Sequence, residues 1–163
     1  MPVRTLWRRL LNSQAVATTF PYTAGSNELP EFVVPKASLV SVVEDDQFFR
    51  DSMRRLMRSL GYSVEAFPSA ADFLASPHLA ETACLIADVH MPAMTGAELH
   101  RHLSDSGYAI PTILVTAYPD DDVRARALND GVVCYLRKPV DENHLIRCLR
   151  VALRSGEPPE EKS

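Results

Sequence analysis

Between residues 38 and 154, short apolar runs alternate with longer segments of helical periodicity. The run Leu39–Val43 is almost entirely β-branched or aliphatic, which is typical of a buried strand. Apolar side chains then recur at helical spacing: Phe49, Met53, Leu56 and Leu60. Gly61 is well placed to end this helix. The first unit of the pattern is therefore a strand followed by an amphipathic helix.

The same unit repeats four more times along the chain. We expect the later strands at residues 64–67, 84–88, 111–116 and 132–136. We expect the later helices at residues 70–75, 95–103, 121–129 and 141–154. Strands that alternate with helices form parallel sheets, because each crossover helix packs on a face of the sheet. The pattern predicts an α/β domain with a doubly wound, five-stranded parallel sheet.

We divide the 163-residue chain into three parts. Residues 37–155 form the α/β domain, and residues 156–163 form a short tail. Residues 1–36 form an arm that has no acidic side chain before Glu28 and combines arginines with leucines near its start. We expect this arm to be disordered and without function, or to contain a short basic interaction helix.

Composition excludes several classes of function. The chain has 17 basic and 21 acidic side chains and a formal net charge of -4, which argues against direct nucleic-acid binding. No apolar stretch approaches the roughly 18 to 20 residues needed to cross a bilayer. Cys84, Cys134 and Cys148 lie far apart without metal-ligand spacing, so we expect reduced thiols in a cytoplasmic protein.

Chemically active side chains follow four of the predicted strands: Glu44, Asp45, Asp88, Thr116 and Lys138. In an open parallel sheet, ligands bind at the carboxyl ends of the strands, so these groups should converge. Carboxylates brought together repel one another unless they share a cation, and an all-oxygen site suits Mg²⁺. A carboxylate beside Mg²⁺ can attack a phosphoryl group, provided that cations and hydroxyl groups stabilise the transferring oxygens. We therefore predict a Mg²⁺ site with phosphoryl chemistry.

Four motifs carry a resemblance to a known family: Val43–Asp46, Asp88–Gly96, Thr116–Ala117 and Tyr135–Pro139. Their order and spacing resemble those of the receiver domain of two-component response regulators. Among these, the motifs are most similar to those of regulators of the nitrogen-fixation type. The resemblance covers residues 38–154. It implies a flavodoxin-like sheet with strand order 2-1-3-4-5.

The resemblance also implies a role for each site residue. Asp88 would be the phosphoacceptor, and the Mg²⁺ ligands would be Asp88, Asp45, the His90 backbone carbonyl and, through water, Glu44. Thr116 and Lys138 would sense the phosphoryl group, Tyr135 would be the switch residue, and the bond before Pro139 would be cis.

Some positions depart from the usual family pattern. Glu44 stands where an aspartate is more common. His90 and Tyr118 occupy the two positions that control water access to the phosphoryl group, and their bulk leads us to expect slow self-dephosphorylation. The other histidines show no metal-binding pattern and are interpreted as surface or rim residues: His78, His100, His102 and His144.

The resemblance implies a signalling protein that catalyses only its own phosphorylation and dephosphorylation. Its donor would be a histidine kinase or phosphotransfer protein. Because only residues 155–163 follow the last helix, we expect a stand-alone receiver. Its output would be phosphorelay, or contact with a downstream protein or a second copy through the face formed by residues 121–129, 132–136 and 141–154.

Three other classes of protein share parts of this pattern. The chain could be the receiver fragment of a longer DNA-binding transcription regulator. An aspartyl-phosphate-using phosphatase would need a second aspartate where His90 stands. A flavodoxin-like cofactor carrier would need a hydroxyl-rich phosphate loop where the chain has Glu44–Asp46, and these acids would repel a phosphate.

Overall fold

The computed structural model of the chain describes residues 37–154. The predictions for the arm (1–36), for residue 155 and for the tail (156–163) lie outside these residues. The strands are β1 (Leu39–Val43), β2 (Ser63–Phe67), β3 (Thr82–Asp88), β4 (Thr112–Thr116) and β5 (Cys134–Arg137). The helices are α2 (Gln47–Ser59), α3 (Ala70–Leu74), α4 (Gly96–Asp105), α5 (Asp121–Asn129) and α6 (Glu142–Arg154), together with a short 3-10 helix η1 (Leu79–Glu81).

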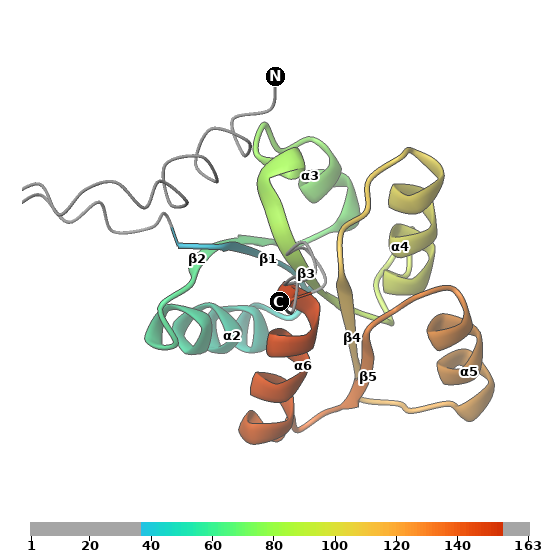
Figure 1. Ribbon diagram of the computed structural model, residues 1–163. Helices are drawn as coiled ribbons and strands as arrows, with labels where there is room; N and C mark the ends of the chain where they lie inside the picture. Colours follow the sequence, from blue (N-terminus) through green and yellow to red (C-terminus); the bar gives the residue numbers. More distant parts are fainter. Residues whose placement is uncertain (1–36, 155–163) are drawn as a thin grey trace, which may run out of the picture. The chain divides into compact units, whose positions relative to one another are not determined.

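The five strands form one parallel sheet in the order β2-β1-β3-β4-β5, which confirms the predicted fold class (Figure 1). The register aligns the carboxyl ends of neighbouring strands through the pairs Val43 with Ala87, Asp88 with Val115, and Thr116 with Arg137. The residues that follow β1, β3, β4 and β5 therefore lie along one edge of the sheet.

Helices cover both faces of the sheet and bury two separate apolar cores. Helices α2 and α6 pack on one face, with Met57 and Leu149 among the buried side chains (Figure 1). Helices α3, α4 and α5 pack on the other face, where Phe73 and Leu99 are buried. Each side chain of this size contributes about 1.5–3 kcal/mol when removed from water. Helix α5 is anchored by one buried residue, Ala127, whereas α6 has four.

Helix α2 begins directly beyond the end of β1. The carboxylate of Asp46 caps it by accepting a hydrogen bond from the Phe49 amide at 2.9 Å. At the other end, Gly61 has φ 90°, a left-handed conformation that glycine adopts without steric cost. The cap fixes the first turn of α2 beside the ends of the strands, where the candidate site lies.

The prediction of three reduced cysteines was wrong. Cys134 on β5 and Cys148 on α6 form a disulfide with a Cα–Cα distance of 6.2 Å, while Cys84 is free and buried. The packing of α6 against the last strand brings the two sulfur atoms together. A sequence separation of 14 residues gave no sign of this contact.

The prediction that His100 lies at the surface was also wrong. Its side chain is buried between α4 and β4, with Nδ1 3.0 Å from the Thr112 hydroxyl oxygen and Nε2 3.1 Å from the backbone carbonyl oxygen of Asp130. Both ring nitrogens thus have polar partners, which makes burial of the ring acceptable. Within residues 37–154, no helix has the length and apolar character needed to cross a membrane.

Candidate metal centre

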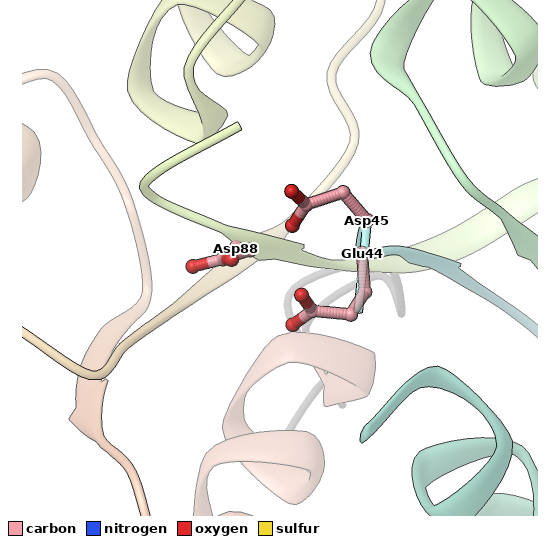
Figure 2. Close-up of side chains that lie close together, drawn as sticks. All are labelled: Glu44, Asp45 and Asp88. Carbon is pink, nitrogen blue, oxygen red and sulfur yellow. The ribbon is translucent and has the colours of Figure 1, made fainter. Parts of the chain in front are cut away.

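Three carboxylates meet where β1 and β3 end. One oxygen from each of Glu44, Asp45 and Asp88 lies within 4.8 Å of the other two, and Figure 2 shows the three side chains around a common space. Glu44 is 2% exposed and Asp88 is 7% exposed, whereas Asp45 faces solvent. Because β1 and β3 are neighbours in the sheet, their ends bring the three acids together. The predicted acidic cluster is therefore present.

A lysine from the end of β5 completes the charged group. The Nζ atom of Lys138 donates to Glu44 Oε2 at 2.7 Å and lies 3.6 Å from Asp88 Oδ2. The backbone amide of Lys138 donates to the carbonyl of Thr116 at 2.7 Å, and the Lys138–Pro139 peptide bond is cis. The ammonium group thus offsets part of the negative charge of the cluster.

The pKa of Glu44 is raised from 4.5 to about 7. Burial is the main cause, since it disfavours the ionised form, and the charge of Asp88 adds to it. The hydrogen bonds from Lys138 and from the Asp46 amide lower the pKa but do not cancel the effect of burial. A divalent cation at this position would favour the ionised carboxylate.

The donor set fits Mg²⁺. The site offers carboxylate oxygens from three residues and an excess of negative charge, and Mg²⁺ prefers oxygen ligands. Both oxygens of Glu44 already accept hydrogen bonds, Oε1 from the Asp46 amide at 3.0 Å and Oε2 from Lys138. Asp45 and Asp88 are therefore the better candidates for direct ligands, and Glu44 is better suited to bind through water.

The remaining predicted residues surround this cluster. The amide of His90 donates to Asp88 Oδ1 at 3.3 Å. The imidazole of His90 packs edge-on against the ring of Tyr118, with 5.9 Å between the ring centroids. Thr116 is fully buried, and its hydroxyl oxygen accepts a hydrogen bond from the Tyr118 amide at 3.0 Å. The two bulky rings thus pack against each other, one from the residues after β3 and the other from those after β4.

Tyr135 points toward a helix. Its hydroxyl accepts a hydrogen bond from the amide of Asp120, the N-cap residue of α5, at 3.3 Å. The half-buried Tyr135 ring packs against the core shared by α3, α4 and α5. The residue predicted to act as a switch therefore connects β5 to the start of α5.

The loop after β3 passes very close to Asp88. The Gly96 amide donates to the Val89 carbonyl at 3.2 Å, and a Cβ atom at position 96 would collide with the backbone carbonyl oxygen of Asp88. A glycine is required at this position because of the close approach.

Sequence reasoning missed two residues of α2 that support the site. Arg50 donates from Nη1 to the backbone carbonyls of Glu44 at 2.7 Å and Asp45 at 3.3 Å. The centroid of the Phe49 ring lies 4.1 Å from Lys138 Nζ. The helical spacing of Phe49 predicts only a place in the core. No sequence signal separates these contacts from ordinary packing.

Beside the site lies an apolar groove of about 500 Å³ between α2 and the segment after β5. Its lining residues are Phe49, Ser52, Met53, Leu56, Lys138, Pro139 and Val140. The groove therefore shares Lys138 with the acidic cluster.

An open, doubly wound parallel sheet with an acidic, lysine-containing site at its carboxyl edge defines the receiver class, and the comparisons agree. The response regulator receiver domain family matches residues 40–150, so the chain belongs to this family. The response regulator protein TodT of Pseudomonas putida is 35% identical over 119 residues, which cover 73% of this chain and 52% of TodT. The transcriptional regulatory protein FixJ of Azorhizobium caulinodans is 33% identical over 125 residues, covering 76% of this chain and 59% of FixJ.

Solved structures give the same result. The crystal structure of FixJ-N is 30% identical with a TM-score of 0.67, covering 74% of this chain and 97% of that one. The low-resolution structure of the response regulator StyR is 35% identical with a TM-score of 0.67, covering 73% and 60%. The predicted resemblance is thereby confirmed. The chain spans about half the length of the curated relatives it matches.

Proposed function

We propose that this receiver accepts a phosphoryl group on Asp88 from a histidine kinase or phosphotransfer protein in the cytoplasm. The observation that carries the proposal is the arrangement of Asp88, Glu44 and Asp45 within 4.8 Å of one another, with Lys138 Nζ 3.6 Å from Asp88. Such an arrangement combines a nucleophilic carboxylate, a site for a divalent cation and a fixed positive charge.

In the proposed transfer, a carboxylate oxygen of Asp88 attacks the phosphorus of a phosphohistidine. The phosphorus–oxygen bond forms as the phosphorus–nitrogen bond to the departing imidazole breaks. Mg²⁺ held by Asp45 and Asp88, with Glu44 through water and the His90 carbonyl, would offset charge on the transferring oxygens.

Lys138 and Thr116 then bind oxygens of the phosphoryl group. Lys138 exchanges its contact with the carboxylates for one with the phosphoryl group. Since the Thr116 oxygen accepts from the Tyr118 amide, its hydroxyl proton is available to donate to a phosphoryl oxygen. The His90 and Tyr118 rings limit the approach of water, which would make hydrolysis of the aspartyl phosphate slow. The chain catalyses no other reaction in this proposal.

The signal would leave through the surface formed by α5, β5 and α6. Tyr135 links β5 to the first residues of α5, so movement of Thr116 and Lys138 toward a phosphoryl group can bias the position of that helix. Leu128 on α5 is an exposed apolar side chain, which supports a protein contact at that helix. The contact would be with a downstream protein or with a second phosphorylated copy; onward phosphorelay is the other route.

The test is incubation with Mg²⁺ and acetyl phosphate, followed by intact mass and by size measurement with beryllofluoride. We expect a Mg²⁺-dependent gain of one phosphoryl group that Asp88→Asn abolishes. Asp105→Asn, which removes an exposed carboxylate at the end of α4, is the matched control and should retain the gain. A gain that persists in Asp88→Asn, or no gain in the unchanged protein, would refute the proposal.

A second form of output is favoured by the relatives. FixJ is named a transcriptional regulatory protein and is longer than the matched region. If this receiver is part of a longer transcription regulator, output would pass to a DNA-binding domain beyond the printed sequence. The intact mass of the protein isolated from its own cells distinguishes the two forms.

A further inference from the structure

Three different elements hold the ammonium group of Lys138. Glu44 from the end of β1 lies 2.7 Å away, Asp88 from the end of β3 lies 3.6 Å away, and the ring of Phe49 on α2 has its centroid at 4.1 Å. The side chain of Lys138 is 17% exposed. The aromatic ring is the uncharged member of this set, and it lies within the distance at which a cation is attracted to a ring face.

Phe49 is fixed independently of the lysine. Its backbone amide donates to the capping carboxylate of Asp46, so the residue lies in the ordered first turn of α2. Its ring packs against the core under α2 and α6 and lines the groove beside the site. The preceding residue, Phe48, is 86% exposed. The two adjacent phenylalanines therefore occupy very different environments, and only one of them faces Lys138.

We propose that Phe49 is a positioning residue that keeps the Lys138 ammonium group at the carboxylates and ready to bind the incoming phosphoryl oxygens. A lysine side chain has several rotatable bonds, and holding it in one place has an entropic cost. A ring that attracts the cation reduces the set of positions available to Nζ before transfer occurs. This inference rests on the proposed phosphoryl acceptance for its kinetic consequence, but the contact itself does not depend on it.

The test compares Phe49→Leu and Phe49→Met, which remove the ring, with Phe49→Tyr, which keeps it. Phe48→Leu is the matched control. Two readouts are made on the full chain: the initial rate of phosphoryl gain from acetyl phosphate at saturating Mg²⁺, and the NMR shifts of the Lys138 side-chain protons. Urea unfolding of each variant separates loss of positioning from loss of the fold.

We expect the ring-free variants to gain the phosphoryl group roughly 2- to 30-fold more slowly, the range that a cation–π contact supports. They should also lose the upfield ring-current shift of the Lys138 protons. Phe49→Tyr and Phe48→Leu should keep both the rate and the shift.

Equal rates and equal Lys138 shifts in Phe49→Leu and Phe48→Leu would overturn the inference, as would a Phe49→Tyr variant as slow as the ring-free ones. If the unchanged protein gains no phosphoryl group, the proposed function fails instead. The Lys138 shifts in the ring-free variants then decide by themselves whether Phe49 holds the ammonium group.

Discussion

The raised pKa of Glu44 predicts an unusual dependence of stability on pH. Between pH 4.5 and about 7, the buried Glu44 carboxyl keeps its proton in the folded protein, while the unfolded chain has lost it. The free energy of unfolding should therefore fall as the pH rises through this interval, because the folded state binds more protons than the unfolded state. The stabilisation is complete below pH 4.5 and absent above the folded pKa.

The difference between the two pKa values sets the magnitude. A rise from 4.5 to about 7 corresponds to about 3 kcal/mol of stability lost across the interval. Glu44→Gln cannot ionise, so this variant should lack the slope. Glu44→Gln also alters the hydrogen bond from Lys138, which displaces the whole profile of the variant without adding a slope. The informative quantity is the difference between the two pH profiles.

The assay is urea unfolding between pH 5 and 8 with a chelator present. Glu142→Gln, which neutralises an exposed glutamate at the start of α6, is the control and should run parallel to the unchanged protein. Added Mg²⁺ should reduce the slope by favouring the ionised carboxylate. If the profile of Glu44→Gln also ran parallel to that of the unchanged protein, burial of this carboxyl would not control its ionisation, and the reasoning would be refuted.

Three further outcomes follow from the geometry. Gly96→Ala should lower the free energy of unfolding by about 1–3 kcal/mol in urea titrations, because the added methyl group meets the Asp88 carbonyl; unchanged stability would contradict this. His90→Ala combined with Tyr118→Ala should shorten the lifetime of the phosphorylated form measured by intact mass, and an equal or longer lifetime would exclude a shielding role for these rings. Reduction of the disulfide, or Cys148→Ser, should cost about 3 kcal/mol of stability for a loop of this length; identical unfolding curves with and without reductant would count against it.

The sequence was most informative where a single strand or helix determines the structure. The first strand and the following helix were both predicted. Each is determined by residues that are close in sequence: a β-branched run for the strand and apolar side chains at a 3.6-residue spacing for the helix. The rule that ligands bind at the carboxyl ends of parallel strands then predicts that Glu44, Asp45, Asp88 and Lys138 lie at one edge of the sheet. Within the last unit, β5 begins at Cys134 and not at residue 132, because the Val132 amide donates to the Ala127 carbonyl and closes the end of α5.

The errors concern contacts between elements that are distant in sequence. Burial of His100 depends on a carbonyl at the end of α5, 30 residues away, and the disulfide depends on how α6 lies on β5. The contact of Phe49 with Lys138 joins residues that are 89 positions apart in the sequence. Hydrophobic periodicity does not predict such contacts, because each residue taken alone also fits an ordinary role in a core or at a surface.

The weak anchoring of α5 has a consequence for how domains of this kind diverge. With Ala127 as its one buried residue and Val123 packed against the core, the rest of α5 can change without disturbing the core. Helix α6, with four buried positions and a disulfide, has much less freedom. If the proposed contact surface includes α5, duplicated copies would acquire distinct partners first through substitutions on this helix, while the acidic site that they inherit stays the same.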